Sequence, residues 1–160
     1  MKSLSITSEF EVFDSELELP EEIQVLMKNA ITARDNAYAP YSQFNVGAAI
    51  LLENDEIIPG SNQENASYPS GLCAERTAVF YAGAKFPDTK IKSIAVSAKS
   101  MKHSVVTPVP PCGACRQALA EYEVKQNSEI EVFFMGESGK VIRANSIKDL
   151  LPLIFDNSCL

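Results

Sequence analysis

The chain has 160 residues, a formal net charge of −7, and 46% hydrophobic and 22% charged residues. This length suits one globular domain, and the apolar share excludes an intrinsically disordered chain. No apolar run reaches the ~18 residues of a membrane span, and the acidic balance disfavours a protein that grips nucleic acid phosphates. Acidic residues occupy the N-terminus where a signal peptide needs an apolar block, so we expect a cytoplasmic protein.

The first half of the chain predicts an extension, a helix and a hairpin. Residues 1–20 are expected to form an N-terminal extension with an edge strand at 4–13, ahead of one domain at 21–160. Pro20 followed by two glutamates is typical of a helix start, and apolar residues then recur at helical spacing. The segment 39–42 ends this helix, and strands at 44–52 and 56–59 pair around Asn54-Asp55.

The second half alternates helices with strands. A loop at 61–72 precedes a helix that begins at Cys73, and the short apolar segment 91–96 predicts a buried strand. The proline-rich segment 107–111 must be extended, and it leads into a helix that contains Cys115. Strands are expected at 130–135 and 140–143, and a terminal helix at 146–155. This order predicts the α/β class, with helices on both faces of a mixed sheet of about five strands in a three-layer form.

Three of the four cysteines have the spacing of a metal site. Cys73 and the pair Cys112 and Cys115 each stand at the start of a predicted helix, where unpaired N–H groups stabilise thiolates. Residues i and i+3 share one side of a helical turn, so Cys112 and Cys115 can reach the same ion. Three thiolates leave one tetrahedral position open, which is typical of a catalytic zinc. Glu75 supplies a carboxylate that can take a proton from water beside such a metal.

These segments resemble a known enzyme family. The sequences Cys-Ala-Glu at 73–75 and Pro-Cys-Gly-Ala-Cys at 111–115 resemble the homotetrameric, three-cysteine branch of the cytidine deaminases. The sequences Asn-Gln-Glu-Asn-Ala at 62–66 and Ala-Pro-Tyr-Ser-Gln-Phe-Asn-Val-Gly-Ala-Ala at 39–49 extend the resemblance, which runs from about Glu21 to Phe155. It implies a cytidine-deaminase-like sandwich fold and zinc-dependent hydrolysis of the 4-amino group of free cytidine and deoxycytidine, a reaction of pyrimidine salvage.

The resemblance also implies roles for single residues. One zinc ion per chain would be held by Cys73, Cys112 and Cys115, and Glu75 would shuttle protons between water, the ring and ammonia. The chain would form a homotetramer with active sites at subunit interfaces. The remaining implied contacts are hydrogen bonds to ribose from Asn62 and Glu64, packing of Phe44 and Ala66 around the nucleoside, a pyrimidine contact from the Ala74 backbone, and contacts with an adjacent subunit from Tyr68 and Phe155.

Arg76 is a candidate to balance the negative charge of a zinc site with three thiolates. Zinc with three thiolates carries a formal charge of −1, which is a poor setting for activating water. A cation that hydrogen-bonds the sulfurs offsets this charge. Arg76 follows Glu75 directly and is the first candidate, as in the family, and Arg116 is the second.

Other interpretations remain open at this stage. Cys159 could complete a structural four-cysteine zinc site, or the C-x-x-C pair could be a redox dithiol. The substrate could be a blasticidin-like nucleoside, or a base within RNA or DNA, although deaminases of polynucleotides usually present a histidine ligand and a basic groove. Glu75 and Arg76 could be a solvated pair on the first turn of a helix, and the whole chain could be a zinc-stabilised binding module. The substitution Cys159→Ser separates a catalytic zinc from the four-cysteine structural site, and Glu75→Ala separates it from the binding module.

Overall fold

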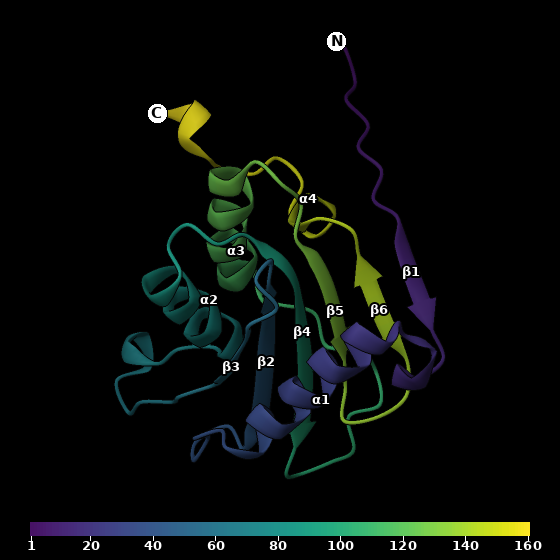
Figure 1. Ribbon diagram of the computed structural model, residues 1–160, viewed down its shortest axis with the longest axis vertical. Coiled ribbons are helices and arrows are strands. Elements are labelled where there is room, and N and C mark those ends of the chain that lie inside the picture. Colours follow the sequence, from purple (N-terminus) through teal and green to yellow (C-terminus); the bar gives the residue numbers. More distant parts are fainter.

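The computed structural model describes residues 1–160 and contains one six-stranded sheet with helices on both faces (Figure 1). The strands lie in the order β1-β6-β5-β4-β2-β3. Strands β4 and β5 are parallel, whereas the other neighbouring pairs are antiparallel. The strand bounds are β1 Phe10–Phe13, β2 Phe44–Leu52, β3 Ile57–Ser61, β4 Ile91–Ser100, β5 Glu131–Met135 and β6 Val141–Ala144.

Alternation along β2 divides the apolar core into two clusters. Ala48, Ile50 and Leu52 face the helices α2 (Ala74–Lys85) and α3 (Gly113–Gln126). Ala49 and Leu51 face α1 (Glu21–Asp35) on the other side of the sheet. Because successive side chains of a strand point to opposite faces, one strand serves both layers. The predicted three-layer α/β architecture around a mixed sheet is confirmed.

The helix α1 begins where the sequence predicts, directly after Pro20, and crosses one face of the sheet (Figure 1). Its buried residues Leu26, Met27 and Ala30 recur at helical spacing and form the stripe that packs on the sheet. Gly47 of β2 lies directly beneath this helix, and a Cβ there would come 2.0 Å from the Ala30 carbonyl oxygen. The close approach therefore requires glycine.

The sixth strand is formed by the N-terminal segment. Phe10–Phe13 pairs with β6 at one edge of the sheet, so the strand is shorter than the predicted 4–13. Ion pairs join Arg143 of β6 to Glu11 of β1 and to Glu131 of β5. None of the helices combines the length and the apolar character that crossing a bilayer requires.

The predicted terminal helix at 146–155 is wrong in extent. The helix α4 spans only Ile147–Leu150, and a short 3-10 turn follows at Asn157–Cys159. Pro152 disfavours helical backbone at Leu151, which has φ −138° and ψ 76°. Leu153 then adopts a positive φ of 59°, which ends any continuation of the helix. The segment after Leu150 therefore runs as irregular chain.

Candidate active site

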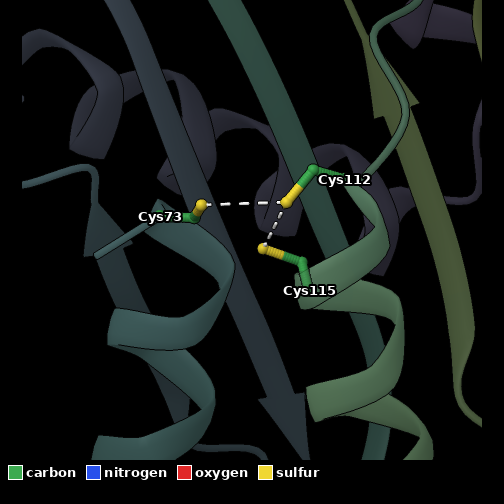
Figure 2. A group of neighbouring side chains, drawn as sticks. All are labelled: Cys73, Cys112 and Cys115. Atoms are coloured by element: carbon green, nitrogen blue, oxygen red, sulfur yellow. Dashed lines mark hydrogen bonds between the residues drawn. The ribbon is translucent and has the colours of Figure 1, made fainter. Parts of the chain in front are cut away.

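The first residues of α2 and α3 bring three cysteines together. Cys73 and Cys112 are the N-cap residues of α2 and α3, and Cys115 lies in the first turn of α3. Figure 2 shows their side chains converging from the two helix starts. The Sγ atoms of Cys73 and Cys112 are 3.9 Å apart, those of Cys112 and Cys115 are 3.5 Å apart, and all three lie within 4.8 Å of one another. The predicted ligand set therefore forms one cluster.

These separations fit a tetrahedral zinc ion. Two sulfurs bound at ~2.3 Å to a tetrahedral centre lie ~3.8 Å apart, which is close to the observed spacing. Cys159 is exposed near the C-terminus and does not belong to the cluster. The cluster thus offers three sulfur ligands and no fourth cysteine, histidine or carboxylate.

The electrostatics of the cluster favour a thiolate at Cys73. A hydrogen bond from Cys115, and then the nearby Arg76, lower the pKa of Cys73 to about 5. The same hydrogen bond, together with burial, raises the pKa of the Cys115 thiol. These shifts favour a thiolate at Cys73 and a protonated thiol at Cys115, and a bound cation would displace that proton.

Arg76 contacts the cluster directly, as predicted. Its Nη2 atom donates to the Cys73 sulfur at 3.5 Å, and this hydrogen bond raises the pKa of the guanidinium. Arg116, the second candidate, instead donates to two main-chain carbonyls, those of Pro111 and Leu150. The two arginines therefore have different positions: Arg76 lies against a sulfur, and Arg116 lies against the backbone.

Glu75 is a buried acid at the base of a cavity. Its side chain is 4% exposed, yet it lines the same cavity as Cys73 and Cys112. Burial raises the pKa of the Glu75 carboxyl above its ordinary value. A carboxyl with a raised pKa can both accept and return a proton near neutral pH, which suits general acid–base chemistry.

The cavity has a volume of about 540 Å³. One wall is formed by Phe44 and Val46 of β2, and the loop after β3 forms another with Asn62 and Glu64. Cys73, Glu75 and Arg76 line the wall formed by the start of α2. The volume is in the usual range of small-molecule sites.

Glu64 and Asn62 are held in place by main-chain groups. The Oε2 atom of Glu64 accepts hydrogen bonds from the amides of Tyr41 and Ser42, at 2.9 Å and 3.2 Å. A hydrogen bond from Ser42 is the largest cause that lowers the pKa of Glu64. The Asn62 amide accepts from the Val46 N–H and donates to the Phe44 carbonyl. Asn62 thus fixes the start of β2, and both main-chain hydrogen bonds to the Glu64 carboxylate involve the same oxygen, Oε2.

The other predicted site residues are divided between the cavity and its surroundings. Tyr68 lines the cavity and is 76% exposed, with its ring 6.1 Å from that of Tyr41. Ala74 is fully buried, and Ala66 is exposed on the loop; neither lines the cavity. Phe155 is 59% exposed on the C-terminal segment and lies outside this cavity.

Sequence reasoning missed several residues of the lining. Tyr41 belongs to a segment that was singled out, although only Phe44 was assigned a contact. Val109 and Pro110 also line the cavity. Their signal is the proline-rich segment before Cys112, because an extended chain that enters the metal cluster must pass beside it.

Comparisons with known proteins agree with this geometry. Residues 20–128 match the sequence profile described as the cytidine and deoxycytidylate deaminase zinc-binding region. A cytidine deaminase from Halalkalibacterium halodurans is 42% identical over 82% of this chain and 92% of its own length. One from Mycobacterium tuberculosis is 35% identical over 82% of this chain and 87% of its own.

Solved structures show the same architecture. The crystal structure of a cytidine deaminase from Burkholderia pseudomallei superposes with a TM-score of 0.70 at 40% identity, covering 82% of this chain and 97% of the other. That from Mycobacterium tuberculosis has a TM-score of 0.65 at 31% identity, covering 84% and 97%. The fold and the site define a deaminase whose three-cysteine cluster fits a zinc ion, and the chain belongs to the cytidine and deoxycytidylate deaminase family.

Proposed function

We propose that the chain is a zinc-dependent hydrolase that converts free cytidine and deoxycytidine to uridine and deoxyuridine with release of ammonia. The observation that carries this proposal is that Glu75 lines one cavity with Cys73 and Cys112, two of the three cysteines whose sulfurs converge. One zinc ion per chain would be held by Cys73, Cys112 and Cys115. A zinc ion bound there supplies a Lewis acid that makes water nucleophilic near neutral pH.

Glu75 would carry the protons of the reaction. Its carboxylate accepts a proton from the attacking water and delivers it to N3 of the pyrimidine, which makes C4 electrophilic. After the C–O bond forms at C4, Glu75 takes the remaining hydroxyl proton and passes it to the amino group. The C–N bond then breaks, ammonia leaves, and the N3 proton remains in the product. The raised pKa of Glu75 supports both halves of this cycle.

The charge of the lining favours a neutral nucleoside over a nucleotide. Its acidic residues are Glu64 and Glu75, and its one basic residue, Arg76, already donates to the Cys73 sulfur. A phosphate group would meet carboxylates without a free cation to balance it. The Oε1 atom of Glu64, which accepts neither main-chain hydrogen bond, can accept one from a ribose hydroxyl, and Asn62 retains one N–H for a second contact. Phe44 offers an apolar surface to the nucleoside.

We further infer a homotetramer in the cytoplasm, with residues 1–20 as an extension of the catalytic domain at 21–160. Support for the assembly comes from exposed aromatic residues at Tyr68, Phe80, Tyr81 and Phe155. Exposed large apolar side chains are typical of surfaces that bind another chain. In the tetramer, Tyr68 and Phe155 would contact an adjacent subunit's cavity.

A substrate panel tests the proposed activity. Purified protein is incubated with cytidine, deoxycytidine, deoxycytidylate or a blasticidin-like nucleoside, and absorbance loss and ammonia release are followed. Both free nucleosides should be deaminated, whereas kcat/KM for deoxycytidylate should be at least ~100-fold lower because of charge repulsion. The relatives compared above are named cytidine deaminases, which disfavours the blasticidin-like alternative. Preference for that compound or for the nucleotide would overturn the assignment.

A further inference from the structure

The two segments that deliver the cysteines are anchored in different ways. Leu72, which precedes Cys73, exchanges two main-chain hydrogen bonds with Gln63, at 2.9 Å and 3.0 Å. This pairing fixes the chain directly before the first sulfur. Cys73 is therefore positioned by the backbone itself.

The segment before Cys112 lacks such pairing. Between Val106 and Pro111 the main chain makes no hydrogen bond to other main-chain groups, and its three prolines carry no N–H to donate. The recorded hydrogen bond to this stretch comes from a side chain: Arg116 Nε donates to the Pro111 carbonyl at 2.7 Å. The Arg116 guanidinium therefore provides a hydrogen bond to the main chain next to Cys112, where main-chain pairing is absent.

The same guanidinium reaches a second element. Its Nη1 atom donates to the carbonyl of Leu150, the last residue of α4, at 2.7 Å. Leu150 is 7% exposed and belongs to the main apolar core, so this carbonyl is a rigid attachment point. Arg116 therefore links the residue before Cys112 to the packed interior.

The next residue of α3, Gln117, contacts a different segment. Gln117 Nε2 donates to the Phe155 carbonyl at 2.9 Å, which ties the irregular C-terminal segment to the first turns of α3. Unlike the Arg116 contact, this one does not involve the segment before Cys112. The two side chains can be tested separately.

We propose that Arg116 is a positioning residue of the metal centre, fixing the Pro111–Cys112 main chain so that the Cys112 sulfur keeps its place in the cluster. This inference rests on the proposed zinc-dependent function. It assigns Arg116 a role different from that of Arg76, which contacts a sulfur. The planar guanidinium donates in two fixed directions at once, which a lysine ammonium cannot reproduce with the same geometry.

The test compares metal binding by four full-length proteins: wild type, Arg116→Ala, Arg116→Lys and Arg143→Ala. Arg143 is the matched control, because it also makes two side-chain contacts but lies on β6 with Glu11 and Glu131. Zinc affinity is measured by competition with a chromophoric chelator, and ligand geometry by the absorption spectrum of the cobalt-substituted proteins. Thermal unfolding of the metal-free proteins records any general loss of stability.

Arg116→Ala should weaken zinc binding by about 10- to 100-fold and change the cobalt spectrum, because outer contacts that orient metal ligands have effects of this size. The zinc affinity of Arg116→Lys should lie between those of the alanine variant and wild type. If the alanine variant does not fold, the lysine variant alone tests the inference. Arg143→Ala should bind zinc within about twofold of wild type. Wild-type affinity and spectrum in both Arg116 variants would overturn the inference while leaving the proposed function intact. A wild-type protein without zinc or cytidine turnover would instead remove the proposed function.

Discussion

Replacing Arg76 with alanine tests the charge balance of the active site. Three thiolates and one Zn²⁺ carry a formal charge of −1, and the Arg76 guanidinium lies 3.5 Å from the Cys73 sulfur. Removal of the guanidinium leaves that charge uncompensated, so activation of water at the site becomes less favourable. The three sulfurs are untouched, and zinc should stay bound.

The size of the effect follows from this one charged hydrogen bond. Hydrogen bonds to charged groups contribute about 1.5–3 kcal/mol, and the partial exposure of Arg76 favours the lower half of that range. Since ~1.4 kcal/mol corresponds to a factor of ten, kcat/KM for cytidine should fall by about 10- to 40-fold. The acidic limb of the pH–rate profile should move up by about one pH unit.

The assay is the loss of cytidine absorbance across a pH series, with zinc content measured on the same samples. Arg76→Lys keeps a cation near the sulfur and should recover part of the rate, although its single ammonium cannot reproduce the guanidinium geometry. Arg143→Ala, on β6, should show the wild-type profile. An unchanged pH–rate profile in Arg76→Ala with full zinc content would refute the charge-offset reasoning.

Three further substitutions probe the cluster, the acid and the support of α2. Cys159→Ser should leave zinc content unchanged, whereas a loss by metal analysis would indicate a four-cysteine structural site. Glu75→Gln should stabilise the metal-free protein. Burial raises the pKa of Glu75, so the stability of the wild-type protein falls as pH rises through that pKa, whereas glutamine does not titrate. In urea unfolding, Glu75→Gln should therefore be more stable than wild type at pH 8 and about equally stable near pH 4. Gly60→Ala places a Cβ 2.5 Å from the Ala74 carbonyl oxygen. The free energy of unfolding should therefore fall by about 1–3 kcal/mol, as measured by thermal unfolding, and cytidine turnover should also fall. Wild-type stability in this variant would contradict the close packing of β3 against α2.

The sequence was sufficient for the chemistry of the site because metal ligands must be particular residue types at particular helix positions. Cys112 and Cys115 share a helical turn by spacing alone. The distance to Cys73 depends on the packing of α2 beside α3 and could only be inferred from the resemblance. The cavity contacts of Tyr41, Val109 and Pro110 could not be predicted, because such residues become part of a cavity only through the fold.

Other differences have local causes. Strand β4 continues to Ser100, beyond the predicted Val96, because Ser97 is buried and its hydroxyl accepts a hydrogen bond from Arg34 of α1. Periodicity could not predict this, since a polar residue in a strand usually indicates a surface position. The apolar residues after Leu150 favour a longer terminal helix than the one observed, because Pro152 disfavours helical backbone at the residue before it. The sequence predicts Arg116 as a second candidate for the charge offset, and its actual partners, the carbonyls of Pro111 and Leu150, could not be predicted because tertiary structure sets them.

The most direct measurement combines metal analysis with cytidine turnover for wild type and Glu75→Gln. Wild type should contain one zinc per chain and release ammonia from cytidine. Glu75→Gln should keep the zinc and lose turnover by at least ~10⁴-fold, because the sulfurs remain while the proton carrier is gone. A metal-free wild-type protein, or a Glu75→Gln variant that deaminates cytidine at the wild-type rate, would contradict a catalytic zinc served by this acid.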